Sequence, residues 1–282
     1  MRFLNTLLCL SLLSFCLSTS AETINIKRVH GEKEELIFSI LKLALSKTDS
    51  SIKFQQSSEF YNDARLVSEV EANNVDVMWA GASPDIEKAL STIRIPVLKG
   101  LLGHRVFIIR NVDKQVFSKI SNLDELRRFT AGQGEFWGDT KVLLNAKIPT
   151  ITTTKYENLF LMLEGERFDY FPRALHEPWT EVKRHSNLNL TVDQNILIIY
   201  PFAMYFYVNN SNSELYNKIY NGFEMAINDG SFDELYFNHP MIKDALIRSN
   251  VKNRKIIRLE NKLMSPKTPY NKKQYWLDVS KL

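Results

Sequence analysis

The turn at residues 132–140 could hold an anion, because it joins an apolar segment to a predicted helix. Gly132 and Gly134 come just before Glu135, and the helical pattern begins at Trp137. Free backbone N–H groups and the positive end of a helix dipole stabilise a carboxylate or phosphate at such a position. An ordinary strand-to-helix turn has the same composition, so the pattern alone leaves both interpretations open.

A second candidate site follows the apolar segment 75–79, which predicts a buried strand. Gly81 permits close approach of a ligand to the backbone, and Ser83 offers a hydroxyl. Ligands of open α/β sheets bind beyond the carboxyl ends of the strands, so we expect a pocket here. Trp79 supplies a ring that could stack on a ligand, although aromatic residues more often belong to the core.

Three motifs resemble those of bacterial periplasmic solute-binding proteins of the amino-acid-binding type, family 3. Residues 75–83, V-D-V-M-W-A-G-A-S, match the family's D-l-a-x-A-G-x-T strand; G-E-R-F-D-Y at 165–170 matches G-r-x-D-A, and 229–236 contains the late D-G turn. The resemblance implies an α/β, two-lobed type II periplasmic binding fold, with mostly parallel sheets flanked by helices and two hinge crossings. It also implies a small-molecule ligand held between the lobes and an inner-membrane ABC permease as partner.

The expected ligand-binding positions depart from the family's pattern. Relatives that bind α-amino acids hold the ammonium group with an aspartate five residues after the one matched by Asp169, where this chain has Ala174. They hold the carboxylate with an arginine five residues after the serine of the first motif, where this chain has Lys88. Arg173 could hold an anion bidentately, and a salt bridge to Asp169 or Glu177 is the structural alternative.

We therefore predict a site for a ligand that carries an anionic group. The predicted ligand-binding residues are Trp79, Gly81, Ser83, Lys88, Gly134, Glu135, Trp137 and Arg173. The five histidines are scattered, without the spacing of a zinc site, and the chain has no nucleophile elbow or phosphate-binding loop. We expect no metal, no cofactor and no enzymatic activity.

The elements that position these residues alternate between strand and helix, which predicts largely parallel sheets. The very apolar stretch 196–208 is interrupted by Pro201 and is predicted to form two strands that return the chain to the first lobe. The predicted lobes comprise residues 22–108 with 205–282, and residues 109–204. The tail from about residue 251 is basic and irregular; we expect it to pack on the first lobe, with membrane binding as the alternative.

Residues 1–21 have the pattern of a cleaved signal peptide, with Arg2 before an apolar run and small residues before Glu22. We therefore expect a periplasmic protein. Both cysteines, Cys9 and Cys16, lie inside this segment, which excludes disulfides and thiol catalysis from the mature chain. A formal net charge of +4 is too small to indicate a nucleic-acid partner, and we expect a monomer.

Two other functions remain open at this point. One is a periplasmic enzyme on the same fold, dehydratase-like, which would need a carboxylate or a histidine projecting into the cleft; Glu135 and His176 are the candidates. The other is a ligand sensor subunit that signals to a membrane receptor. The sequence does not distinguish transport from signalling.

Overall fold

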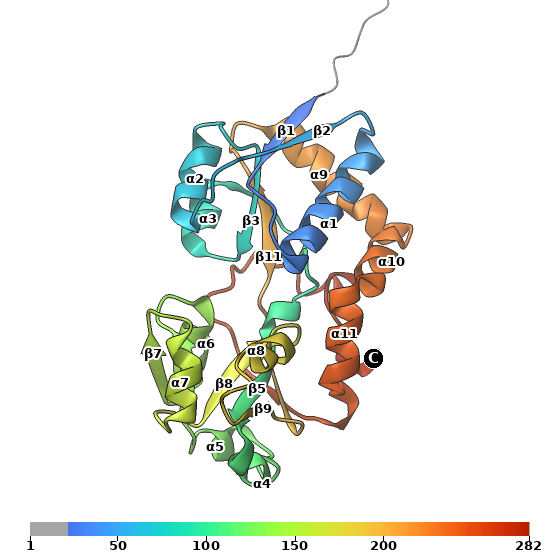
Figure 1. The fold of residues 1–282 in the computed structure, drawn as a ribbon. Coiled ribbons are helices and arrows are strands. Elements are labelled where there is room, and N and C mark those ends of the chain that lie inside the picture. The colour runs from blue at the N-terminus through green and yellow to red at the C-terminus, as the bar shows by residue number, and fades with distance from the viewer. Residues whose placement is uncertain (1–21, 282) are drawn as a thin grey trace, which may run out of the picture.

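The computed structural model describes residues 22–281, so the predicted signal peptide at 1–21 lies outside the described residues. This part of the chain forms two lobes, each built on a sheet flanked by helices (Figure 1). The first sheet has the strand order β2-β1-β3-β11-β4. The second has the order β12-β10-β5-β8-β6-β7, and β9 also pairs with β5.

The first sheet is built from the alternating pattern that the sequence predicts. Its elements are β1 (Thr23–Ile26), α1 (Glu32–Thr48), β2 (Lys53–Gln56), α2 (Asp63–Glu71), β3 (Val77–Gly81), α3 (Pro84–Ala89), β4 (Ser91–Ile93), β11 (Met204–Val208), α9 (Ser213–Asn228) and α10 (Ser231–Asn238). β1 pairs in parallel with both β2 and β3. β11 runs antiparallel between β3 and β4, because it enters this sheet from the other lobe.

The second sheet follows the first crossing of the chain, residues 94–103, which ends in a short 3-10 helix. Its elements are β5 (His104–Arg110), α4 (Lys114–Phe117), α5 (Leu123–Leu126), β6 (Ala131–Gly134), α6 (Gly138–Asn145), β7 (Thr150–Thr153), α7 (Asn158–Glu164), β8 (Tyr170–Ala174), α8 (Pro178–Arg184), β9 (Leu190–Val192), β10 (Ile196–Ile199) and β12 (Lys255–Arg258). Residues 200–203 form the second crossing, between β10 and β11.

The sheets are more mixed than the expected mostly parallel arrangement. Every antiparallel pair involves β5 or β11, the strands that directly follow the two crossings. The other pairs, β1 with β2 and β3, β6 with β7 and β8, and β10 with β12, are parallel. A strand that arrives from the other lobe therefore enters its sheet against the direction of the strands already there.

The strands differ from the predicted lobe boundaries in two places. All of β5 belongs to the second sheet, although the prediction kept residues up to 108 in the first lobe. β12 lies in the tail that was expected to be irregular, and it pairs in parallel with β10 of the second sheet. Its end residues Lys255 and Arg258 are exposed, which explains why the segment looks like a charged tail, whereas Ile257 is buried.

The main apolar core extends across both sheets. It joins Val77 of β3 to Val106 of β5 and Leu197 of β10, and it includes the buried faces of α1 and α9. The helix α11 (Pro240–Ser249) contributes Ile242 to the same core and lies beside the second lobe in Figure 1. None of the helices between residues 22 and 281 is long and apolar enough to cross a membrane.

Candidate functional site

Phe202, in the second crossing, lies between a turn of the first lobe and a turn of the second lobe. A Cβ atom built on Gly81, at the end of β3, would lie 3.1 Å from the Phe202 ring. A Cβ built on Gly138, at the start of α6, would lie 3.3 Å from the same ring. The end of β3 and the turn before α6, both predicted to bind ligand, therefore converge on one aromatic side chain.

The first lobe has a pocket of about 200 Å³ at the carboxyl end of β1. The lining residues are Lys27, Arg28, His30, Glu34, Glu59, Phe60 and Tyr61. The Arg28 guanidinium lies 4.6 Å from the centroid of the Phe60 ring, and the His30 ring meets the edge of Phe60 at 6.2 Å. Phe60 is 68% exposed, so the pocket offers a ring and a cation to solvent.

Arg28 makes no ion pair with any residue in the range 22–281, and its side chain is exposed. A guanidinium with open donors and a stacked ring beside it can hold a planar anionic group. Sequence reasoning missed this residue, although a signal was present. Arg28 lies two residues after the end of β1, whose carboxyl end lies at the edge where α/β sheets bind ligands.

Trp79 supports this pocket from the core instead of lining it. Its side chain is 1% exposed, and its Nε1 donates a 2.7 Å hydrogen bond to Oε2 of Glu34. Glu34 forms a 2.9 Å ion pair with Lys27, whose Nζ lies 4.7 Å from the Trp79 ring centroid. Glu34 and Lys27 both line the pocket, and Phe206 packs edge-on against the Trp79 ring. In this arrangement the indole has no open face for stacking on a ligand.

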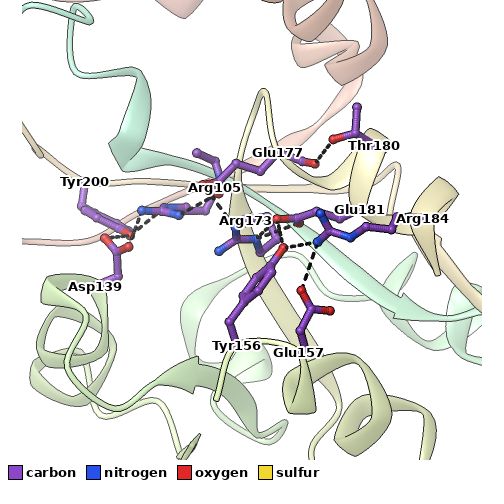
Figure 2. Close-up of polar contacts among 11 residues, drawn as sticks. Arg105, Asp139, Tyr156, Glu157, Arg173, Glu177, Thr180, Glu181, Arg184 and Tyr200 are labelled. Carbon is purple, nitrogen blue, oxygen red and sulfur yellow. Dashed lines mark hydrogen bonds and ion pairs between the residues drawn. The ribbon is translucent and has the colours of Figure 1, made fainter. Parts of the chain in front are cut away.

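Arg173 in the second lobe is already occupied by carboxylates (Figure 2). Its Nη2 and Nε donate to Glu181 at 2.6 and 2.9 Å, and Nη2 lies 3.2 Å from Glu177. The alternative of a salt bridge to Glu177 is thus found in the structure, whereas Asp169 pairs with Arg110 at 3.7 Å. Burial alone would lower the pKa of Arg173, but the two glutamates outweigh it and raise that pKa. The guanidinium stays charged and paired.

The paired guanidinium also positions aromatic side chains. Its carbon lies 5.1 Å from the Trp137 ring centroid and 4.8 Å from that of Phe171, and these two rings stack at 6.2 Å. Tyr156 donates its hydroxyl hydrogen to Glu181, as Figure 2 shows. Arg173 therefore fixes Trp137 at the start of α6, which is a different role from the anion binding that we predicted for it.

A buried polar cluster connects the first turn of α6 to the second crossing (Figure 2). Asp139, in the first turn of α6, pairs with Arg105 of β5 and accepts a 2.7 Å hydrogen bond from the Tyr200 hydroxyl. Arg105 Nε donates to the same hydroxyl oxygen at 3.0 Å. Burial raises the pKa of Tyr200 well above its usual value, so the phenol keeps the proton that it donates. The cluster therefore connects α6 and β5 to the second crossing.

Glu177 contacts the two buried arginines of the second lobe, Arg173 and Arg105. Besides its contact with Arg173, it lies 3.5 Å from Arg105 and accepts a 2.7 Å hydrogen bond from the Ala174 backbone N–H. Burial opposes its ionisation, but Arg173, His176 and Arg105 lower the pKa of Glu177 to about 2. Burial lowers the pKa of His176 to about 4, which keeps the imidazole neutral near pH 7.

The remaining predicted residues lie apart from the pocket. Ser83 precedes α3 without a side-chain capping hydrogen bond, and Lys88 is exposed on that helix. Gly134 is buried at the end of β6, and Glu135 is exposed in the turn after it. Glu135 and His176, the two candidates for an enzymatic role, form no hydrogen bond with each other in the described part of the chain. Within residues 22–281, no group of three acidic or histidine side chains is arranged to hold a metal ion.

Comparison with solved structures identifies the fold. No protein-family model matches the chain, and no curated protein matches its sequence. An ancestral arginine-binding protein bound to arginine is 16% identical with a TM-score of 0.52, covering 77% of this chain and 98% of its own. The probable amino-acid ABC transporter extracellular-binding protein ytmK of Bacillus subtilis is 15% identical with a TM-score of 0.58, covering 79% and 100%.

A third similar structure is substrate-binding domain 2 of Lactococcus lactis GlnP in its open conformation, at 16% identity and a TM-score of 0.51, covering 79% of this chain and 96% of that one. A histidine kinase sensor domain with similarity to periplasmic binding proteins is also similar, at 10% identity and a TM-score of 0.50, covering 78% of this chain and 96% of that one. Identities this low establish the architecture alone. The chain has the two-lobed α/β fold of the substrate-binding proteins of amino-acid ABC transporters.

Proposed function

We propose that this chain is a periplasmic solute-binding protein that captures a small ligand between its lobes and delivers it to an ABC permease. The observation that carries the proposal is the pocket at the end of β1, where Arg28, which forms no ion pair within residues 22–281, lies beside the exposed Phe60 ring. The convergence of both lobes on Phe202 supports it, because bending at the second crossing could bring the second lobe toward a ligand bound in the pocket. The similar structures are binding proteins, which supports a role without catalysis.

We further propose that the ligand carries an anionic group held by Arg28. The predicted anchor, Arg173, has its guanidinium saturated by two carboxylates, so an anion would have to displace Glu177 or Glu181 there. Arg28 requires no such displacement. The Phe60 ring, which stacks on the guanidinium, would contact an apolar or ring-bearing part of the same ligand.

The test is a thermal-shift screen of residues 22–282 against amino acids, dicarboxylates and aromatic acids, followed by calorimetric titration of any compound that raises the melting temperature. Arg28→Met should weaken binding by about tenfold or more, because a hydrogen bond to a charged group contributes about 1.5–3 kcal/mol. Arg167→Met is the matched control, since Arg167 is also exposed and lies outside the pocket. The proposal fails if no compound in the panel binds, or if both variants bind it as the parent protein does.

A further inference from the structure

The end of the chain, residues 254–281, contacts both lobes and both hinge crossings, and we call it the C-terminal strap. It follows α11 and is drawn in red in Figure 1, where it passes from the second lobe into the region between the lobes. The strap begins in the second sheet and ends in the main core.

The strap is anchored in the second lobe by Arg254 and β12. The Arg254 side chain is fully buried, and its Nη1 donates to the carbonyl oxygens of Asp193 and Ile196 at 2.7 and 3.0 Å. β12 then pairs with β10 along its whole length, from Lys255 opposite Ile196 to Arg258 opposite Ile199. A buried guanidinium whose Nη1 donates to two backbone carbonyls of the second lobe anchors this end of the strap.

The next residues continue the pairing with β10 and then bind the second crossing. The Leu259 N–H donates to the carbonyl oxygen of Ile199 at 2.9 Å. The Asn261 side-chain amide donates to the carbonyl oxygen of Pro201, also at 2.9 Å. Pro201 directly precedes Phe202, the residue that touches a turn of each lobe. The strap thus holds the backbone that presents this ring.

The middle of the strap is anchored in the first lobe. Met264 is 8% exposed and packs in an apolar cluster with Met78 and Ala80 of β3. Lys272 donates to Glu224 of α9 at 2.8 Å, and the Tyr275 hydroxyl donates to the same carboxylate. The strap is therefore attached to both sheets through side chains as well as backbone.

The last part of the strap binds the first crossing. The Leu277 N–H donates to the carbonyl oxygen of Lys99 at 2.8 Å, and Lys99 Nζ donates to the carbonyl oxygen of Gln274 at 2.8 Å. The Trp276 ring covers Gly100, where a Cβ atom would lie only 2.7 Å from it. Gly100 has a φ of +73°, so the first crossing turns at the residue against which this indole packs.

We propose that the C-terminal strap is a third connection between the lobes and sets the equilibrium between lobe arrangements. Both crossings are hydrogen-bonded to one segment that is itself anchored in both lobes. Bending at either crossing must therefore break strap contacts or carry the strap along, and each arrangement that breaks them is disfavoured. This inference concerns the ligand-free protein and does not depend on which ligand binds.

The test is single-molecule FRET on the ligand-free chain 22–282, which contains no cysteine of its own. Lys53→Cys in β2 and Gln115→Cys in α4 place dyes at exposed positions, one in each lobe. Asn261→Ala should change the ratio of the lobe arrangements by about fivefold, the factor equivalent to one hydrogen bond of about 1 kcal/mol. Asn271→Ala, an exposed strap position, is the matched control and should leave the ratio unchanged.

An unchanged distance distribution in folded Asn261→Ala, confirmed by circular dichroism, overturns the proposal. Hydrogen exchange of the unaltered protein gives a second, independent test. The amides of Leu259 and Leu277 should exchange as slowly as amides within the sheets, because Leu259 is bonded to the last residue of β10 and Leu277 to Lys99 of the first crossing. Exchange of both amides at the rate of an unstructured tail would contradict the proposal that the strap connects the lobes.

Discussion

Removing the carboxylate of Asp139 should destabilise the second lobe far more than removing an exposed one. Asp139 is buried, and it accepts from both Arg105 and the Tyr200 hydroxyl. Asp139→Ala leaves the Arg105 guanidinium, whose side chain is only 4% exposed, without its closest partner. Breaking a buried pair by deleting one member costs about 3–5 kcal/mol, because an uncompensated charge stays buried.

Asp124→Ala provides the matched control. Asp124 forms a 2.6 Å ion pair with Arg127, but its side chain is 86% exposed. Exposed pairs of this kind contribute about 0–1 kcal/mol, so this variant should unfold at nearly the parent urea concentration. The two variants delete the same atoms and differ only in burial and partners.

Urea unfolding followed by tryptophan fluorescence and by circular dichroism compares the three proteins. Trp137 lies at the start of the helix that Asp139 anchors, so its emission reports on the affected turn. The expected result is a clear fall in the Asp139→Ala midpoint with the Asp124→Ala midpoint almost unchanged. Equal, small shifts in both variants would refute the reasoning, because they would mean that water replaces the lost carboxylate inside the lobe.

Two further predictions concern the core and its pH dependence. Gly222→Ala should cost several kcal/mol of stability in urea unfolding, since its Cβ would lie 1.9 Å from the Ala44 carbonyl oxygen where α9 contacts α1. The control Asn221→Ala, on the exposed side of α9, should cost less than about 0.5 kcal/mol. A parent-like Gly222→Ala midpoint would show that the helices separate freely. Burial lowers the pKa of His104 to about 4, below the unfolded value of 6.5. Between these two pH values the unfolded state binds more protons than the folded state. The free energy of unfolding should therefore fall by about 1–2 kcal/mol from pH 6.5 to pH 5. His104→Gln should flatten that slope, and His176, whose pKa is lowered in the same direction, should account for part of what remains.

The fold was largely predictable because its elements differ in hydrophobic period. Apolar residues at helical spacing predict a helix over 213–228, and α9 has these bounds, with Asn212 capping its first turn. The sequence pattern predicts a strand near 129–131, whereas β6 spans Ala131–Gly134, because a strand that is half glycine lacks the β-branched residues typical of strands. β12 was not predicted for a different reason, because its charged end residues resemble those of a basic tail.

The site was less predictable because it depends on contacts between distant segments. Arg28 and Phe60 lie on different loops, and only the folded chain shows that one stacks on the other. The partner Glu177 of Arg173 could be proposed from its closeness in sequence, whereas the bidentate partner Glu181 depends on how α8 folds back over β8. Spacing predicted that Arg173 is a charged anchor but not that its charge is already neutralised.

Calorimetric titration of the parent chain and of Arg28→Met with a compound from the thermal-shift screen tests the central claim most directly. The account predicts one ligand per chain and a negative heat-capacity change, since a ligand enclosed between two lobes buries apolar surface. It also predicts an affinity about tenfold or more weaker in the variant, from the loss of a charged hydrogen bond. Binding that is equally tight in both proteins would contradict the assignment of the pocket, and a continuing heat signal from turnover would contradict a binding protein altogether.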